Sequence, residues 1–189
     1  MTLEGPSPED LRKIHGEVNQ LVNQRFLLTT AAVTIYGAFT AWLLPRQTPA
    51  PGAPTGGFIY AMSLALLCTL FVLYLFKHML LGMLRIFTTY LDVTAKSGWE
   101  QDWAAYRRKY AYLGYTKPQT LVFAFLGGLV LAMPFALQVA YGLTAAPTTG
   151  MWLLILGTVA YELAVILMGF NHIPDVETKT RERWVELSK

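Results

Sequence analysis

Long apolar stretches dominate this sequence, and four of them are almost free of charged residues. Each has 19 residues or more, and they cover residues 26–44, 58–76, 121–143 and 152–170. An α-helix needs about 20 residues to cross a hydrocarbon core that is roughly 30 Å thick. The pattern therefore predicts an all-α integral membrane protein with four transmembrane helices at these positions.

The segment before the first predicted span has the pattern of a helix that enters the membrane without a break. Ser7, Pro8 and Asp10 are suited to a capping-box start. Apolar residues and one arginine then recur at alternating spacings of three and four: Leu11, Ile14, Val18, Leu21, Arg25 and Leu28. Such a heptad seam requires a partner helix, from another subunit or from the middle of the chain. We expect residues 1–25 to form a cytoplasmic amphipathic helix continuous with the first span.

Polar side chains line one flank of this expected helix. They are His15, Asn19, Gln20, Asn23, Gln24 and Arg25, which we call the polar flank. Amides both donate and accept hydrogen bonds. The flank therefore suits either hydrogen bonding between helices at the membrane mouth or contacts to a base, ribose or phosphate. Arg25 would add positive charge to a ligand site, or extend to lipid headgroups.

The middle segment, residues 77–120, is expected to form a cytoplasmic helical hairpin. Its first part continues the second span, so that residues 58–91 would form one helix projecting from the bilayer. Its second part carries aromatic and basic side chains at helical spacing, including Trp99, Trp103, Arg107, Arg108 and Lys109. Rings beside cations suit an anionic lipid surface, or the phosphates and bases of a nucleic acid. A further helix with Trp184 is expected in the tail, residues 171–189.

Composition and charge agree with a membrane protein and predict its orientation. Apolar residues make up 54% of the chain and charged residues 14%, whereas about a quarter of a soluble chain is charged. Fourteen of the 15 Lys and Arg residues fall in the N-terminal segment, the middle segment and the tail, and Arg46 falls in the first loop. The positive-inside rule therefore places both termini in the cytoplasm.

Within the predicted spans, Glu162 is the one ionisable carboxylate, near the centre of the fourth. A carboxylate at this depth costs a few kcal/mol unless it is protonated or faces a polar interior. By counting, Thr34 and Tyr36 of the first span lie at a similar depth, and Gln138 lies about 7 Å nearer the outside. These four residues are candidates for lining a pore. The alternative is that Tyr36 satisfies a protonated Glu162 inside the bundle.

Small residues recur every fourth position in two spans and predict close helix packing there. The two stripes are Ala124, Gly128 and Ala132, and Thr30, Thr34 and Ala38. The sequence contains no phosphate-binding glycine loop, no metal-spaced Cys/His set and no nucleophile elbow. We therefore expect no enzyme, no metal and no cofactor. A lipid-modifying enzyme would have to rest on Asn171, His172 and Asp175 alone.

The junction "HGEVNQLVNQRFLLTT", His15 to Thr30, on a small four-span protein resembles membrane effectors of bacterial anti-phage systems, the Hailong type in particular. Those effectors are paired with nucleotidyltransferases. The resemblance implies a homo-oligomer in the bacterial inner membrane that depolarises the cell when active. It also implies control by a nucleotide or oligonucleotide, with the polar flank as ligand or gate contacts and a nucleotidyltransferase as partner. The alternative is a non-conducting membrane anchor or regulatory subunit for a cytoplasmic partner.

Overall fold

The computed structural model describes residues 7–43, 57–94, 116–140, 148–171 and 173–187 of the chain. Every element within these ranges is helical: α1 (Pro8–Leu43), α2 (Gly57–Thr94), α4 (Thr116–Ala140), α5 (Thr149–Ile166), the π-helical turn η3 (Leu167–Asn171) and α6 (Ile173–Leu187). The structure has 4 helices that are long and apolar enough to cross a membrane: α1, α2, α4, and α5 continued by η3. The prediction of an all-α protein with four membrane spans is confirmed.

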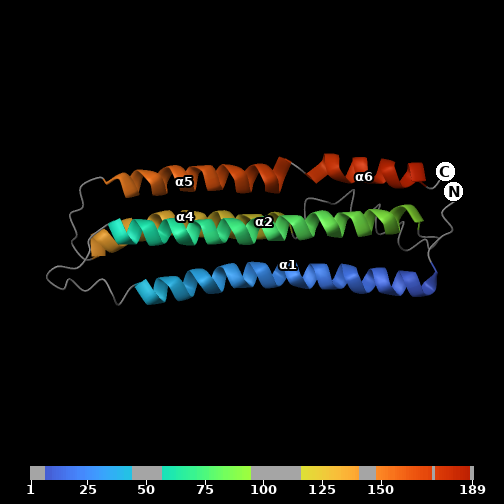
Figure 1. Ribbon diagram of the computed structural model, residues 1–189, viewed down its shortest axis with the longest axis horizontal. Helices are drawn as coiled ribbons and strands as arrows, with labels where there is room; N and C mark the ends of the chain where they lie inside the picture. Colours follow the sequence, from blue (N-terminus) through green and yellow to red (C-terminus); the bar gives the residue numbers. More distant parts are fainter. Residues whose placement is uncertain (1–6, 44–56, 95–115, 141–147, 172, 188–189) are drawn as a thin grey trace.

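The long helices lie side by side, with α1 and α5 on opposite sides of α2 and α4 (Figure 1). α6 follows α5 along the same side of the bundle, and the start of α1 and the end of α6 lie at the same end of it. α2 packs against α1, α4, α5 and α6, so it is the central helix. Rings from three helices meet in the core, where the centroids of Tyr74 and Phe123 are 5.3 Å apart and those of Phe71 and Tyr161 are 6.1 Å apart.

α1 begins with the capping box that the sequence predicts. The backbone N–H of Asp10 donates to Oγ of Ser7 at 3.2 Å, and the Ser7 hydroxyl donates to Oδ2 of Asp10 at 2.7 Å. From there α1 continues for 36 residues and α2 for 38. Each is therefore about 55 Å long, which exceeds the roughly 30 Å of a hydrocarbon core. Both helices extend well beyond the part that a membrane would cover.

The heptad seam of α1 faces α2. Its members are buried or half-buried, whereas most residues between them are exposed. α2 buries a row of residues that is also spaced by three and four: Leu67, Leu70, Tyr74, Lys77 and Leu81. This row contacts α4 and α5, where the Tyr74 hydroxyl donates to the backbone oxygen of Val165. Of the two partners that the sequence allowed for the seam, the chain itself supplies one, the helix that continues the second span.

Close packing in the bundle depends on glycines other than the one in the predicted stripes. A Cβ at Gly157 would lie 3.1 Å from Leu64, and one at Gly127 or Gly169 would overlap side chains of a neighbouring helix. Gly128, by contrast, has no other group within 4 Å of that position. Gly128, Ala132, Thr30, Thr34 and Ala38 are all exposed. The prediction of close packing is wrong for these five residues within the chain, whereas Ala124 packs against the core. The core-facing side of α4 includes Phe123, Gly127 and Val130.

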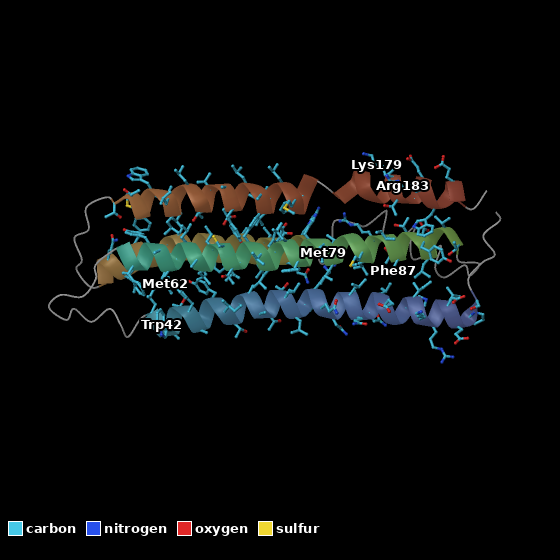
Figure 2. All side chains as sticks on the ribbon, viewed as in Figure 1. Trp42, Met62, Met79, Phe87, Lys179 and Arg183 are labelled. Carbon is cyan, nitrogen blue, oxygen red and sulfur yellow. The ribbon has the colours of Figure 1, made fainter. Side chains whose placement is uncertain are left out.

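α6 packs against the part of α2 that lies beyond the predicted span. Nε of Arg181 is 3.5 Å from Oδ2 of Asp92, and the ring centroids of Trp184 and Tyr90 are 4.8 Å apart. Lys179 and Arg183 are exposed on the same helix (Figure 2). The tail helix is thus present, and its Trp184 contacts Tyr90. The expected aromatic and basic helix with Trp99, Trp103, Arg107, Arg108 and Lys109 lies outside the described residues.

The neighbouring glycines of α4 provide a test of this packing. Gly127→Ala places a methyl group against Oε1 of Glu162 and the ring of Tyr161, and we expect a loss of about 1–3 kcal/mol in stability. Gly128→Ala gains the same helix propensity in open space, and we expect it to be neutral or slightly stabilising. Unfolding of both variants in the same detergent measures the difference. An equal effect of the two substitutions would contradict the packing described here.

Candidate functional site

Two cations are buried between α1, α2 and α4, near the ends of the predicted spans. Arg25 is 5% exposed and Lys77 is 1% exposed. Each occupies a position in the row of residues that its helix buries: Arg25 follows Leu21 in α1, and Lys77 follows Tyr74 in α2. Each cation therefore points to the buried side of its helix.

The first turns of α4 supply polar partners for both. Nη2 of Arg25 donates to Oε1 of Gln119 at 2.9 Å. Nζ of Lys77 is 3.5 Å from Oγ1 of Thr120. Gln119 and Thr120 are themselves buried, so little of this polar cluster is exposed. We call these four side chains the cation cluster.

Aromatic rings complete the surroundings of Lys77. Its Nζ lies 4.7 Å from the ring centroid of Tyr74 and 5.5 Å from that of Phe123, which are cation–π distances. An ammonium group carries three donors. Within the described ranges, Lys77 makes one long hydrogen bond and no ion pair with a carboxylate. Lys77 therefore has donor capacity that the described side chains do not fill.

Lys77 is a candidate that sequence reasoning missed, because it was counted only as a basic residue of the middle segment. A signal for it exists in the sequence. Leu70, Tyr74, Lys77 and Leu81 are spaced by four, three and four, which is the same heptad pattern that places Arg25 in the seam of α1. A lysine at such a position points into a helix interface, whereas a lysine in a loop would be solvated.

Glu162 lies on α5 where that helix meets α4. The side chain is partly buried, and its Oε1 is buried against Gly127 without a hydrogen-bond partner among the described residues. The alternative in which Tyr36 satisfies Glu162 is therefore not formed at this oxygen. Tyr36 instead packs against the hydrophobic core from α1.

The other pore candidates do not gather around Glu162 within one chain. Thr34 is exposed on α1. Nε2 of Gln138 donates to the hydroxyl of Tyr60 on α2. Gln138 follows Gly127, the neighbour of Glu162, by eleven residues in α4, so by helical rise it lies about 16 Å from that level, toward the C-terminal end of α4. The predicted difference in depth between Gln138 and Glu162, about 7 Å, is too small. It holds only if the third and fourth spans are centred at the same depth.

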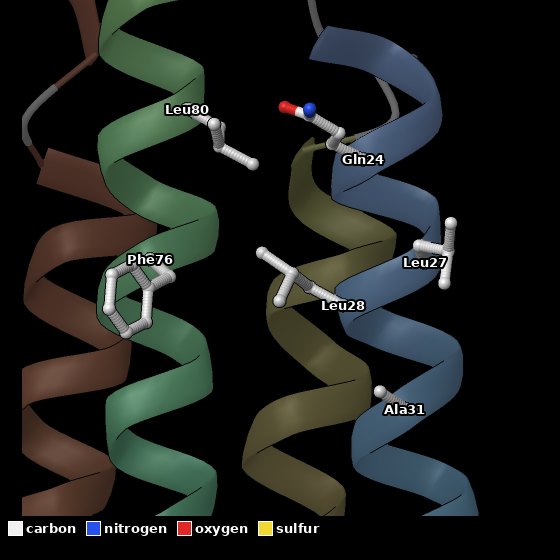
Figure 3. A pocket seen from close by; sticks show the side chains of 6 residues that line it. All are labelled: Gln24, Leu27, Leu28, Ala31, Phe76 and Leu80. Carbon is white, nitrogen blue, oxygen red and sulfur yellow. The ribbon is translucent and has the colours of Figure 1, made fainter. Parts of the chain in front are cut away.

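The polar flank of α1 divides into three environments. His15, Asn19, Gln20 and Asn23 are exposed, Gln24 is half-buried and Arg25 is buried. Gln24 lines an open groove of about 310 Å³ between α1 and α2, whose other lining residues are apolar: Leu27, Leu28, Ala31, Phe76 and Leu80 (Figure 3). Four of the six predicted ligand or gate residues are thus accessible on one helix, and Arg25 belongs to the cation cluster.

The tyrosine next to Glu162 provides a test of the core contacts. The hydroxyl of Tyr161 donates to the backbone oxygen of Phe123 at 2.9 Å across the α5–α4 interface. We expect Tyr161→Phe to lower the free energy of unfolding by about 0.5–1.5 kcal/mol. Tyr36→Phe is the matched control, since the Tyr36 hydroxyl has no hydrogen bond within the described residues. Denaturant titration of both variants in detergent measures the effect, and equal losses would count against the interface hydrogen bond.

The chain thus places a buried cation cluster at one depth, a carboxyl group deeper in the bundle, and an exposed amide flank on the extension of α1. Comparison with known proteins found no match among family models, curated proteins or solved structures.

Proposed function

We propose that this protein is a homo-oligomeric, ion-conducting membrane effector that a cytoplasmic nucleotide or oligonucleotide controls, and that it depolarises the bacterial inner membrane in anti-phage defence. The observation that carries the proposal is Glu162. This carboxyl group lies in the middle of a membrane-grade helix, is partly exposed, and has a buried oxygen without a hydrogen-bond partner among the described residues.

The cost of that carboxyl group favours an assembly. A carboxylate at mid-membrane costs at least about 2.5 kcal/mol, and such groups usually face a bundle interior or a water-filled cavity. The described part of one chain offers Oε1 no donor. An oligomer in which the α4–α5 face of each subunit borders a shared lumen would supply water to Glu162. A ring of these carboxylates would then favour cations.

The exposed small residues supply a surface for such an assembly. Membrane helices associate through close backbone approach, and small residues four apart permit it. Gly128 and Ala132 on α4, and Thr30, Thr34 and Ala38 on α1, lie exposed in that spacing. Only 11% of the most apolar window of α1 is buried inside the chain. These faces are available to other subunits.

The continuity of α1 supports control from outside the membrane. The exposed residues His15, Asn19 and Asn23 belong to the same uninterrupted helix as the first span. A ligand that binds one conformation of the oligomer more tightly than another would shift the populations. Displacement of the polar flank would be transmitted along α1 into the membrane. The resemblance of His15–Thr30 to anti-phage effectors supports a nucleotidyltransferase product as that ligand.

The second candidate is a non-conducting anchor or regulatory subunit. The hydrogen bond of Gln138 with Tyr60 favours it, because this amide serves the packing of one chain and is not available to a lumen. Exposed Lys179 and Arg183 on α6 would then contact a cytoplasmic partner.

Conductance in planar bilayers separates the two candidates. We expect purified protein without ligand to conduct, with a preference for cations, and Glu162→Gln to reduce that preference while the protein stays oligomeric. Glu182→Gln is the matched control, because Glu182 is an exposed carboxylate of α6. Absence of conductance from the intact protein, in both ligand-free bilayers and bilayers with added nucleotide, would leave the anchoring role.

The polar flank is tested in cells. We expect Asn19→Ala combined with Asn23→Ala to change the membrane potential of expressing cells at unchanged protein abundance, because the exposed amides bias the open and closed states. A potential-sensitive dye measures the change, and Lys13→Ala, an exposed substitution nearer the start of α1, serves as the control. Identical potentials for the double variant and the wild type would exclude this flank as the control site.

A further inference from the structure

Three positive features meet in the cation cluster. Arg25 and Lys77 bring two side-chain charges, and the third is the N-terminal end of α4, which begins at Thr116. The first turn of a helix carries unsatisfied N–H groups and a partial positive charge. Gln119 and Thr120, the partners of Arg25 and Lys77, lie in that end of α4. Gln119 and Thr120 are neutral, and they sit where the helix dipole also favours an anion.

Like charges act on each other within this arrangement. The positive charge of Arg25 repels that of Lys77. The positive charge of Arg85, one turn beyond Leu81 on α2, repels that of Arg25. Taking a cation out of water costs several kcal/mol unless an opposite charge accompanies it. Among the described residues, no carboxylate acts on Lys77. The group that would offset this charge is an anion from outside the described chain.

The depth and the donors indicate which anion. Arg25 directly precedes the first predicted span and Lys77 directly follows the second, so the cluster lies at the level of one headgroup layer. Its guanidinium, ammonium and amide groups can together donate to several oxygens of one group. Arginine and lysine with backbone N–H groups at a helix start are the usual donors to phosphate.

We propose that Arg25, Lys77, Gln119 and Thr120 form a phosphate-binding site at the junction of α1, α2 and α4, with half-buried Arg85 at its approach. The phosphate belongs either to an anionic phospholipid or to a soluble nucleotide that enters from the same side. Binding there would tie α1 to α4 through one shared anion. The inference does not depend on ion conduction, so it can hold or fail separately from the function proposed above.

Thermal unfolding of the full chain in nanodiscs tests the site. Nanodiscs of phosphatidylcholine alone are compared with nanodiscs that also contain phosphatidylglycerol, and with phosphatidylcholine nanodiscs to which ATP is added. We expect the wild type to unfold at a higher temperature in at least one of the two anion arms. A shift with phosphatidylglycerol identifies a lipid headgroup, and a shift with ATP identifies a soluble phosphate.

Substitutions assign the shift to the cluster. Lys77→Met keeps the length of the side chain and removes its charge, and we expect it to bind the effective anion about ten- to a hundredfold more weakly. We expect Lys77→Arg to retain the shift. Lys117→Gln is the matched control, because it removes one charge from the same end of α4 at a less buried position, and we expect the wild-type shift. Thr120→Val, which keeps the volume, replaces Lys77→Met if that variant does not fold.

Two results would overturn the proposal. One is a wild type whose unfolding temperature is the same in all three nanodisc conditions. The other is a loss of the shift in Lys117→Gln as large as that in Lys77→Met, because a general attraction between basic residues and anions would then explain it. Lys77→Met should also unfold at or above the wild-type temperature in phosphatidylcholine alone, since it no longer buries a charge.

Discussion

The burial of two cations between three helices is the constraint that the rest of the bundle has to satisfy. At the edge of a hydrocarbon core there is little water to solvate a guanidinium or an ammonium, so neighbouring helices must supply the partners. Gln119 and Thr120 do so from the start of α4. Thr120 in turn lies against Gly169, where a side chain at the glycine would overlap it. The position of η3, and with it the end of the fourth span, follows from the placement of the cluster.

The buried cations and the carboxyl group of Glu162 have different surroundings in the membrane part. The cations have polar neighbours on a second helix of the same chain, and rings of the core lie over Lys77. The buried oxygen of Glu162 has van der Waals neighbours on α4 but no donor among the described residues. The described residues therefore supply polar neighbours to the cations near one membrane boundary and no donor to Oε1 of the deeper carboxyl group. This asymmetry is the physical basis for regarding Glu162 as a group that functions in an assembly.

The sequence was sufficient for the elements and insufficient for their neighbours. Four spans, the start of α1 at Ser7 and the continuation of α2 past Lys77 follow from apolar length and capping residues, which are local properties. The seam of α1 predicted that a partner exists, but periodicity cannot distinguish a helix of the same chain from one of another subunit. The contact of Arg25 with Gln119 depends on how α1 and α4 align in depth, which no local pattern specifies. No local pattern specifies either that Gly127 packs against α5, while Gly128, which belongs to the evenly spaced stripe, does not.

The hydrogen bond between Arg25 and Gln119 joins residues 94 positions apart, and this separation bears on how the protein is made. During synthesis α1 enters the membrane two spans before α4 exists. Until the third span arrives, Arg25 has neither Gln119 nor the start of α4 beside it. The arginine must therefore stay hydrated at the membrane surface, which holds the nascent α1 at a shallower position or a different tilt. Its final depth is reached only when α4 is inserted, so maturation of the first span waits for the third.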